Sequence, residues 1–561
     1  MVKFEKEKWL VTAALPYVNN IPHVGNIVGS HLPADIFARF LRLFGKDVVF
    51  VGGTDEHGSP TEVAAFKAGL TPKELCDKLF KTHKKIYDWF GISYDNFSRT
   101  SREINHKVVT QIFLKLWKNG FIIRKKILLP YCKFDKRFLP DRWVEGTCPY
   151  CGYRPARGDQ CENCTRLLNP SELIEPYCII CKNKPEFKEV EHLFLDLPKF
   201  EKRLEEWIRK NKHWKENVRN FALSWIKEGL KPRCITRDLK WGIKVPLEGF
   251  EDKVFYCWFD APIGYISSTI EWAEKIGKKE KWKEYWKEKD AKIIHFLGKD
   301  NIPFHAIIWP AILMGSGEFN LPYQVAALEF LNYEGDKISK SKNWGIFLDV
   351  KDEKVIVRAE ESVIDIEPDY LRFYLASIMP ETKDSNFVWK DFENRINNEL
   401  IGNFGNFAFR VLSFIKNNFN STIPEPENLG KKDKTLIKKI TSTKNSVKKV
   451  ILKLEFKKGL KKVLLLSKAG NKYFQEKKPW ETLKKDPVDC ANTLYISANL
   501  LRSLAILLAP FIPFTCEKLW KQLNLKGSVH EQRFEDLDKL ELVPGHRIGE
   551  IKPLFKKFGG V

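Results

Sequence analysis

The stretch that decides the fold is residues 9–58, which begin WLVTAALPYVNN and end VVFVGGTDEHG. The apolar run at 9–15 predicts a buried strand, residues 27–43 carry apolar side chains at helical spacing, and residues 48–51 predict a second strand. The order strand, loop, helix, strand is a βαβ unit, which predicts an α/β fold with a Rossmann-like parallel sheet. Because ligands of such sheets bind outside the carboxyl ends of the strands, we expect functional residues in the two polar loops.

The loop after the first strand is suited to binding a phosphate group. It contains the sequence HVGN at 23–26, directly before the predicted helix, and a helix N-terminus offers unpaired N–H groups and partial positive charge. Gly25 has no side chain, so a flat ring can lie against the backbone there, and His23 can donate to a phosphate oxygen. These four residues alone are more typical of an ordinary strand-to-helix turn. A second motif, KISKS at 337–341, favours the functional interpretation.

In their order and separation, the two motifs resemble the HIGH and KMSKS signatures of the class I aminoacyl-tRNA synthetases. Asn26 stands where the first signature has its second histidine, and an asparagine can hydrogen-bond but cannot carry a proton's charge. Ile338 replaces the methionine of the second signature, an apolar exchange of similar volume that should matter little. The resemblance implies an ATP-dependent, AMP-forming ligase.

The composition favours an anionic partner. The 561-residue chain has a formal net charge of +23 and a pI of about 9.3, for which nucleic acid is the natural partner, although a generally lysine-rich proteome gives the same balance. The N-terminus is charged, and its apolar run is too short for a secretory signal. The longest apolar stretch, 500–514, is interrupted by Arg502, Pro510 and Pro513, so we expect no membrane span and a cytoplasmic location.

Twelve cysteines in such a compartment indicate metal binding rather than disulfides. Two CxxC pairs, separated by nine residues, can hold one tetrahedral ion from two tight turns, and four thiolates leave no open coordination position. We therefore expect one structural Zn²⁺, bound by Cys148, Cys151, Cys161 and Cys164. A third CxxC pair is accompanied by an upstream cysteine and aspartate, namely Cys178, Cys181, Cys132 and Asp135. The sequence leaves two alternatives for these four residues. They bind a second zinc through three cysteines and an aspartate, or the second site has lost its zinc.

The chain divides into five predicted parts. They are a first half of the Rossmann catalytic domain (1–118), a connective insertion with the zinc knuckle or knuckles (119–229), the second half of the catalytic domain (230–326), a linking domain with the KMSKS loop (327–388), and an α-helical bundle with a C-terminal tail (389–561). Apolar residues at spacings of three and four predict the bundle. We further expect strands at 254–260 and 293–297, a capped helix opening at 71–74, and a lysine-rich loop at 429–432.

Further stretches resemble one branch of this family, the methionyl-tRNA synthetases, over essentially the whole chain. They include ALPYVN at 14–19, GTDEHG at 53–58, WFDAPIGY at 258–265 and GKDNIPFH at 298–305. The resemblance implies that methionine is activated with ATP to methionyl-adenylate and then transferred to the 3′ end of tRNA(Met), including the initiator tRNA. It also implies Mg²⁺ with the ATP, and an anticodon-binding role for the helical bundle.

The resemblance also assigns roles to residues. The catalytic residues would be His23, Asn26, Lys337 and Lys340; ATP would be bound by His23, Gly25, Asn26, Asp300 and Lys340; methionine by Leu15, Tyr17, Asp55, Trp258, Ala261, Pro262, Tyr265 and His305; and the anticodon by Asn406, Arg410 and Trp480. A thioether suits an aromatic pocket, because sulfur makes favourable contacts at ring edges, and a carboxylate suits the substrate ammonium. Tyr265 and His305 are expected to direct polar hydrogens toward the sulfur.

Two other classes of function compete. Synthetases for leucine, isoleucine or valine usually carry a large editing insertion, whereas the insertion here is about one small domain in size, and a cysteine enzyme would use zinc at its active site. A non-catalytic RNA-binding scaffold has no reason to keep charged groups such as His23, Asp55 and Lys340 around one site. Because a C-terminal barrel of some relatives is absent, we expect a monomer, with a separately encoded tRNA-binding protein as a possible partner in trans.

Overall fold

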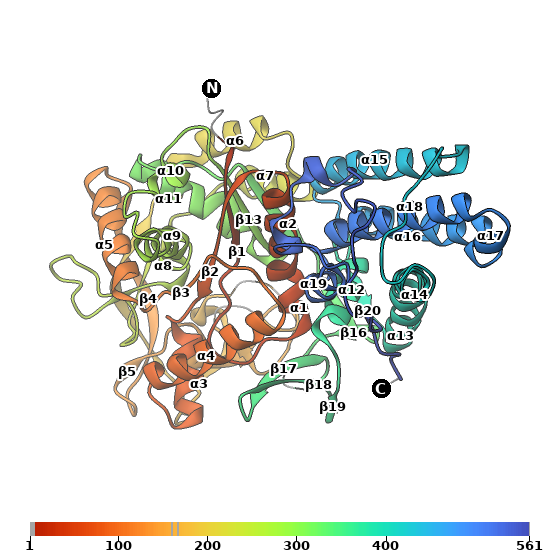
Figure 1. Cartoon of the computed structure of the whole chain (residues 1–561). Helices are drawn as coiled ribbons and strands as arrows, with labels where there is room; N and C mark the ends of the chain where they lie inside the picture. The colour runs from red at the N-terminus through yellow and green to blue at the C-terminus, as the bar shows by residue number, and fades with distance from the viewer. Residues whose placement is uncertain (1–5, 159–160, 165, 167, 341, 560–561) are drawn as a thin grey trace.

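The core of the catalytic part is a five-stranded parallel sheet. The structure, a computed structural model, describes residues 6–158, 161–164, 166, 168–340 and 342–559. The strand order is β14 (Gln324–Leu328), β13 (Lys292–Gly298), β1 (Lys8–Ala13), β2 (Asp47–Thr54) and β3 (Asn96–Arg99). Central β1 pairs with β2 and β13 in parallel register, for example Val11 with Phe50 and Ile294, and its residues from Trp9 on are buried. The predicted Rossmann-like sheet is confirmed (Figure 1).

The predicted βαβ unit at the N-terminus is present. The chain passes through the short α1 (Val24–Asn26) and a π-helical turn at Ile27–His31 into α2 (Leu32–Leu43), which leads to β2. Helices α3 (Ser59–Ala68), α4 (Pro72–Trp89) and α5 (Glu103–Lys118) follow. The predicted cap of α4 is also confirmed, because the Glu74 N–H donates to the Thr71 hydroxyl at 3.3 Å and the Thr71 N–H donates to the Glu74 carboxylate at 2.8 Å.

The prediction of a strand at 254–260 is wrong beyond Phe255. Strand β12 (Val254–Phe255) pairs with β11 (Thr236–Arg237) and forms an isolated bridge with Lys244, outside the main sheet. The chain then forms the helical turn α8 (Cys257–Asp260), closed by the Ala261 N–H on the Cys257 carbonyl, and continues into α9 (Gly264–Lys275). A short buried apolar run has the same composition in a strand and in a buried helix, so periodicity does not separate the two.

The segment between the sheet halves folds as an insertion. Long strands β4 (Ile122–Cys132) and β9 (Glu186–Leu195) form an antiparallel ribbon, with β5 (Arg137–Phe138) and β10 (Arg233–Cys234) at its edges. A second small sheet consists of β7 (Ala156–Arg157), β6 (Val144–Thr147) and β8 (Ile174–Cys178). The 3₁₀ turn at Asp141–Trp143, directly before β6, packs against α3, and the rings of Trp143 and Phe66 lie 5.9 Å apart. Helices α6 (Glu201–Lys210) and α7 (Glu216–Lys227) close the insertion.

The second catalytic half adds α10 (Lys283–Trp286) and α11 (Trp309–Ser316), the latter preceded by 3₁₀ and π-helical turns at Lys299–Asn301 and Phe304–Ile308. The following segment carries two small sheets and a helix. Their members are β15 (Leu331–Tyr333), β16 (Asp336–Lys337), β20 (Ser385–Phe387), β17 (Ile346–Lys351), β18 (Lys354–Ala359), β19 (Ser362–Ile364) and α12 (Pro368–Ser377). The β17–β18 pair lies next to α1 and α4, beside the first signature loop (Figure 1).

The C-terminal part is the predicted helical bundle. It contains α13 (Trp389–Arg395), α14 (Asn406–Asn418), α15 (Lys431–Ile451), α16 (Phe456–Lys477), α17 (Pro479–Lys485), α18 (Pro487–Leu508) and α19 (Pro513–Gln522), with a π-helical segment at Ile396–Gly405. The loop expected at 429–432 ends earlier, because Gly430 caps α15 and Lys431 already belongs to the helix. By length and composition, α18 could cross a membrane, but 94% of its most apolar window is buried, as in a core helix of the bundle.

Candidate active site

The two signature loops meet at the carboxyl edge of the sheet. His23 forms a β-bridge with Phe347 of β17, and the two rings lie 6.1 Å apart. A Cβ atom added to Gly25 would lie 2.9 Å from the His23 imidazole and 3.2 Å from the Ile338 side chain. A side chain at position 25 would therefore clash with His23, and Ile338 of the second signature borders the glycine of the first.

The proton of His23 is held on one ring nitrogen. His23 caps α1: its Nδ1 accepts from the Asn26 N–H at 3.3 Å, while the Asn26 side-chain oxygen accepts from the His23 N–H at 3.1 Å. Burial and the nearby Lys340 lower the pKa of His23 to about 3, so the ring is neutral at pH 7. A neutral ring that accepts at Nδ1 carries its proton on Nε2, which can donate to a phosphate oxygen.

Lys340 supplies a cation beside this histidine. Its side chain stays accessible to solvent, yet the surrounding protein lowers its pKa to about 8, and its charge depresses the pKa values of both His23 and His83. Lys337 lies on β16 and is exposed. Asp300 lies in the turn after β13, and burial raises its pKa. Ser341, the last residue of the motif, lies outside the described residues.

Two buried carboxylates lie at the ends of β2 and α8. The first, Asp55, has an Oδ1 atom without a hydrogen-bond partner among the described residues, and the same holds for Asp260. The other oxygen of Asp260 lies 2.5 Å from His57 Nδ1. Burial, together with the charge of Asp260, raises the pKa of Asp55 well above its ordinary value, and burial does the same for Asp260. Unpartnered buried carboxylate oxygens indicate that a cationic group is the missing partner.

Aromatic side chains form a second group at the same edge. Trp258 stacks on Phe304 with ring centroids 3.6 Å apart, and Tyr17 meets Trp258 edge-on at 6.2 Å. His305 donates from Nδ1 to the Asn301 carbonyl at 3.1 Å, so its Nε2 accepts from the Tyr265 hydroxyl at 2.9 Å. Both hydrogens therefore have partners in the protein, which differs from the expected arrangement in which they point at a substrate sulfur.

The remaining residues expected in this pocket lie close by. The Leu15 side chain lies 3.0 Å from the position of a Cβ added to Gly264, and 3.5 Å from one added to Gly53. Ala261 and Pro262 are buried in the turn between α8 and α9. Glycines thus make room for Leu15 between the end of β2 and the start of α9.

The cysteines of the insertion gather into two clusters. In the first, Sγ of Cys148 lies 3.9 Å from that of Cys164, and Sγ of Cys151 lies 3.6 Å from that of Cys161. A tetrahedral zinc with Zn–S bonds of about 2.3 Å requires sulfurs about 3.8 Å apart, so this cluster fits zinc. Within each cluster, all the candidate ligand atoms lie within 4.8 Å of one another.

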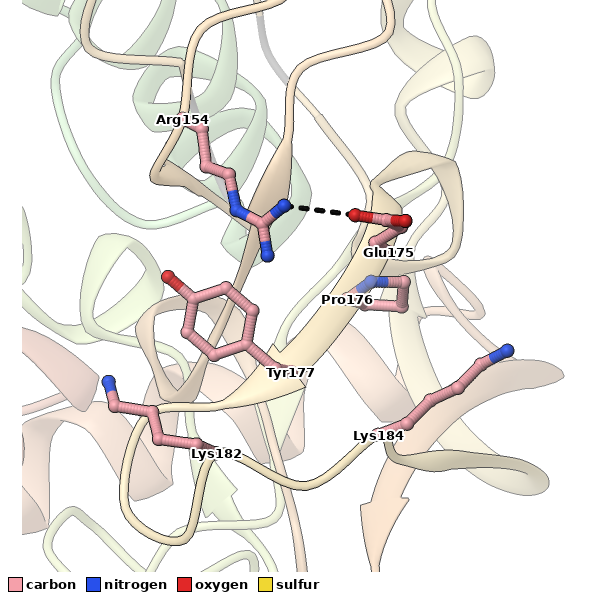
Figure 2. Close-up of a pocket in the computed structure, with 6 residues that line it drawn as sticks. All are labelled: Arg154, Glu175, Pro176, Tyr177, Lys182 and Lys184. Atoms are coloured by element: carbon pink, nitrogen blue, oxygen red, sulfur yellow. Dashed lines mark hydrogen bonds and ion pairs between the residues drawn. The ribbon is translucent and has the colours of Figure 1, made fainter.

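The second cluster contains the residues that the sequence left open. Sγ of Cys132 lies 3.4 Å from that of Cys181, and the Asp135 carboxylate lies 3.2 Å from Cys132 and 3.0 Å from Cys178. Three thiols and a carboxylate at these distances also fit a tetrahedral metal ion. A separate pocket of 540 Å³ lies on the insertion, lined by Arg154, Glu175, Pro176, Tyr177, Lys182 and Lys184 (Figure 2). Its lining includes no residue of the signature motifs.

The three residues expected at the anticodon form a cluster in the bundle. Arg410 of α14 donates to the Gln475 side chain at 3.2 Å, and its guanidinium lies 6.0 Å from the Trp480 ring. Asn406 begins α14 one turn earlier and is exposed, and 41% of Trp480 is exposed. An exposed indole beside an arginine is an arrangement that stacks unpaired bases.

Comparisons with known proteins agree with this geometry. The family described as tRNA synthetases class I (M) matches residues 9–412, and the anticodon binding domain of methionyl tRNA ligase matches residues 423–559. The chain is 46% identical to the methionine–tRNA ligase of Pyrococcus furiosus, over 98% of this chain and 75% of that protein. It is 44% identical to that of Sulfolobus acidocaldarius, over 98% and 95%.

The chain belongs to the methionyl-tRNA synthetase family. It is therefore a ligase of the class I aminoacyl-tRNA synthetase type. Among solved structures, it is similar to Mycobacterium tuberculosis methionyl-tRNA synthetase in complex with methionyl-adenylate, with a TM-score of 0.78, 25% identity, and coverage of 98% of this chain and 99% of that one.

Two residues of the site were not predicted from the sequence. Asp260 and His57 are separated by 203 positions, and they pair only because α8 folds back onto the end of β2. Both lie in stretches that carry the family resemblance, so the sequence marked these stretches as functional. Nothing in the sequence indicates that the two side chains meet.

Proposed function

We propose that this protein activates methionine with ATP and transfers the methionyl group to tRNA(Met), including the initiator tRNA. The observation that carries the proposal is the convergence, at one sheet edge, of the two signature loops with the buried Asp55 and Asp260, whose free oxygens call for a cation. The relatives named above are methionine–tRNA ligases, and the similar solved structure holds methionyl-adenylate.

The first proposed step joins methionine to AMP. A carboxylate oxygen of methionine attacks the α-phosphorus of ATP, and the bond to the β-phosphate oxygen breaks to release pyrophosphate. Chemistry of this kind depends on positioning and on charge stabilisation at the phosphate oxygens. We assign this stabilisation to His23 Nε2 and Lys340, with Lys337 and Asn26 assisting, while Gly25 lies under the adenine and Asp300 holds the ribose. Mg²⁺ would accompany the ATP and offset its negative charge.

The second step transfers the methionyl group. A terminal ribose hydroxyl of the tRNA attacks the carbonyl carbon of the adenylate, the hydroxyl proton is lost, and AMP leaves. No protein nucleophile is required. We assign substrate binding to Leu15, Tyr17, Asp55, Trp258, Ala261, Pro262, Tyr265 and His305, and anticodon binding to Asn406, Arg410 and Trp480.

We propose two structural zinc ions in the insertion. The first would be held by Cys148, Cys151, Cys161 and Cys164, and the second by Cys132, Asp135, Cys178 and Cys181. The sulfur and oxygen separations support both sites. Zinc would fix the turns that carry its ligands and would take no part in the chemistry, because four protein ligands leave no open position.

The predicted five-part division of the chain remains a proposal, as do a cytoplasmic location, a monomeric state and a tRNA-binding protein in trans. The division is supported by the separate sheets of the insertion and by the all-helical C-terminal part. Sedimentation of the purified protein, alone and with cell extract, would test the monomer and the partner.

ATP–pyrophosphate exchange tests the proposed function directly. We expect exchange with methionine and none above background with leucine, isoleucine, valine or cysteine. Exchange with another of these amino acids would keep the adenylate chemistry and overturn the substrate. The absence of exchange with all five, in folded and zinc-loaded protein, would favour the RNA-binding scaffold.

A further inference from the structure

Helix α4 carries two buried polar side chains next to the first signature loop. They are His83 and Tyr87, each 1% exposed, which we call the α4 clamp. Residues four apart lie on the same face of a helix, so both side chains point in one direction. Strand β17, which forms the bridge with His23, lies against the same helix (Figure 1). Neither clamp residue belongs to a signature motif, and a buried polar side chain needs a partner.

His83 holds the loop that precedes the first signature. Its Nε2 lies 2.9 Å from the carbonyl oxygen of Asn20. A carbonyl oxygen only accepts, so His83 Nε2 carries a proton and donates it. At the start of this loop, the Val18 N–H donates to the Asp55 carbonyl at 3.0 Å. His83 thus restrains the middle of a loop that is tied to Asp55 at one end and leads into His23 at the other.

Tyr87 holds the helix that follows the first signature. Its hydroxyl oxygen lies 3.2 Å from Nε2 of His31, the last residue of the π-helical turn after α1. The rings of Tyr87 and His31 also stack, with centroids 4.4 Å apart. On its other side, His31 Nδ1 lies 2.6 Å from the Tyr94 hydroxyl. The α4 clamp therefore contacts the chain on both sides of the signature at 23–26.

The hydrogen bonds of the clamp run in one direction. Only one assignment among the four side chains gives every ring nitrogen a partner. In it, His83 Nδ1 accepts from the Tyr87 hydroxyl at 3.5 Å, the Tyr87 oxygen accepts from His31 Nε2, and His31 Nδ1 accepts from the Tyr94 hydroxyl. Burial lowers the pKa of His83 to about 4 and that of His31 to about 3, so both rings are neutral at pH 7, as this assignment requires. A fully matched chain of this kind favours a single position of the loop.

The clamp also borders the second signature. Burial lowers the pKa values of His23 and His83, and the nearby charge of Lys340 lowers both further. A protonated His83 would place a second cation beside Lys340, and the neutral ring avoids this repulsion. From the opposite side, the Leu348 N–H of β17 donates to the Pro22 carbonyl at 3.1 Å. The loop is therefore held between α4 and the strand that follows the second signature.

We infer that His83 is a positioning residue for adenylate formation, which acts through His23 by holding the loop at Asn20. The inference rests on the proposed function, because it concerns the same site. Without this hydrogen bond, the loop keeps its contacts at both ends and gains freedom in the middle. A displacement of about 1 Å at a reacting group can cost about 100-fold in rate. The loss should appear in kcat, because His23 Nε2 is assigned to charge that develops in the transition state.

The test is a double-mutant cycle in the full-length protein, measured by methionine-dependent ATP–pyrophosphate exchange. His83→Leu should lower kcat about 10- to 100-fold and change KM for methionine by less than about threefold. In a His23→Ala background, the same change should lower kcat by less than about threefold, because the group that it positions is already gone. His83→Gln keeps a side-chain N–H that can donate to the Asn20 carbonyl, so its kcat should stay within about fivefold of the wild type.

His546→Leu is the matched control. It removes another histidine hydrogen bond to a backbone carbonyl, from Nε2 to the Leu523 oxygen at 2.7 Å, in the C-terminal part, and it should leave kcat unchanged. An equal loss from His83→Leu with and without His23 would mean that His83 supports the fold rather than His23, and would overturn the inference. Wild-type kcat in His83→Leu, or equal losses in the leucine and glutamine variants, would overturn it as well. The absence of exchange in the wild type itself would instead contradict the proposed function.

Discussion

At the scale of single residues, Lys340 gives the most direct prediction. A lysine whose pKa is lowered from 10.5 to about 8 is charged at pH 7 and loses that charge as the pH rises through 8. If its cation stabilises the phosphates of ATP, then kcat/KM for ATP in the exchange reaction should fall above about pH 8, because this parameter reports the free enzyme.

The Lys340→Arg variant tests whether Lys340 causes this fall in kcat/KM above pH 8. Arginine stays charged throughout the range, so the fall above pH 8 should disappear even if the maximal rate is reduced. If kcat/KM for ATP still falls near pH 8 in this variant, then another group titrates there, and Lys340 does not act at the phosphate site.

The environment of Asp55 predicts that its carboxylate binds the substrate ammonium. Its free buried oxygen and its raised pKa both show a carboxylate without a cation, and a bound ammonium would supply one. The Asp55→Asn variant should raise KM for methionine by about 10- to 150-fold, the equivalent of one charged hydrogen bond of about 1.5–3 kcal/mol. KM for ATP should stay within about twofold, and an equal rise in both would indicate a collapsed site rather than a lost ammonium contact.

At this scale the sequence predicts which residues belong to the site better than it predicts which residues they contact. His23, Asn26 and Lys340 stand in local motifs, and the structure brings their loops together. The pair of His57 and Asp260, and the hydrogen bond from Tyr265 to His305, depend on contacts between distant segments. Such contacts are properties of the packed fold and have no local pattern.

At the scale of elements, the insertion should bind two zinc ions. Metal analysis of the purified protein should give about two zinc atoms per chain, and Cys178→Ala should give about one. The Cys148→Ala variant should also leave about one, which makes the two variants matched controls for each other. A wild-type content of one, unchanged by Cys178→Ala, would show that the cysteines and Asp135 approach one another without a metal.

Elements with a long periodic pattern were predicted well, and short ones were not. The helices of the bundle and the strands beside β1 follow from apolar spacing over many residues. The apolar run at 254–260 is short enough to suit a strand or a buried helical turn, and the fold selects the turn. The lysines at 431–432 were assigned to a loop by their charge, whereas Gly430 and Asp433 cap a helix there.

At the scale of the whole molecule, one buried arginine joins the catalytic part to the bundle. Arg372 of α12 donates to Asp35 of α2 at 2.7 Å and to the carbonyls of Phe90, Pro510 and Phe511 at 2.8 to 2.9 Å. The apolar core is continuous across the same boundary, where the rings of Phe40 and Phe511 lie 5.5 Å apart. No local pattern in the sequence predicts this junction, because its members come from four separate segments.

This junction predicts how the molecule unfolds. We expect wild-type protein to unfold in one thermal transition, and Arg372→Met to lower its stability by about 3–5 kcal/mol, because the change removes one of the two cations that pair with the buried Asp35 and takes the arginine donor from three buried carbonyls. The bundle and the catalytic part should then melt separately in calorimetry. Arg395→Met, which removes a half-exposed pair with Asp391, should cost less than about 1 kcal/mol and keep one transition.

Acid should act on the same junction. Although burial alone would raise the pKa of Asp35, Arg39, Arg372 and Ser93 lower it to about 2, so this group stabilises the fold above its unfolded value of 3.8. That contribution is lost as the pH falls from about 4 through 2, and the loss should be smaller in Arg372→Met, whose Asp35 is already less stabilised as an anion. Stability measured by urea unfolding between pH 5 and about 2.5 would show the difference as a shallower acid slope in the variant. Parallel slopes would mean that the carboxylate of Asp35 draws its stabilisation from Arg39 and Ser93 alone, and that Arg372 joins the two parts only through its three carbonyl contacts.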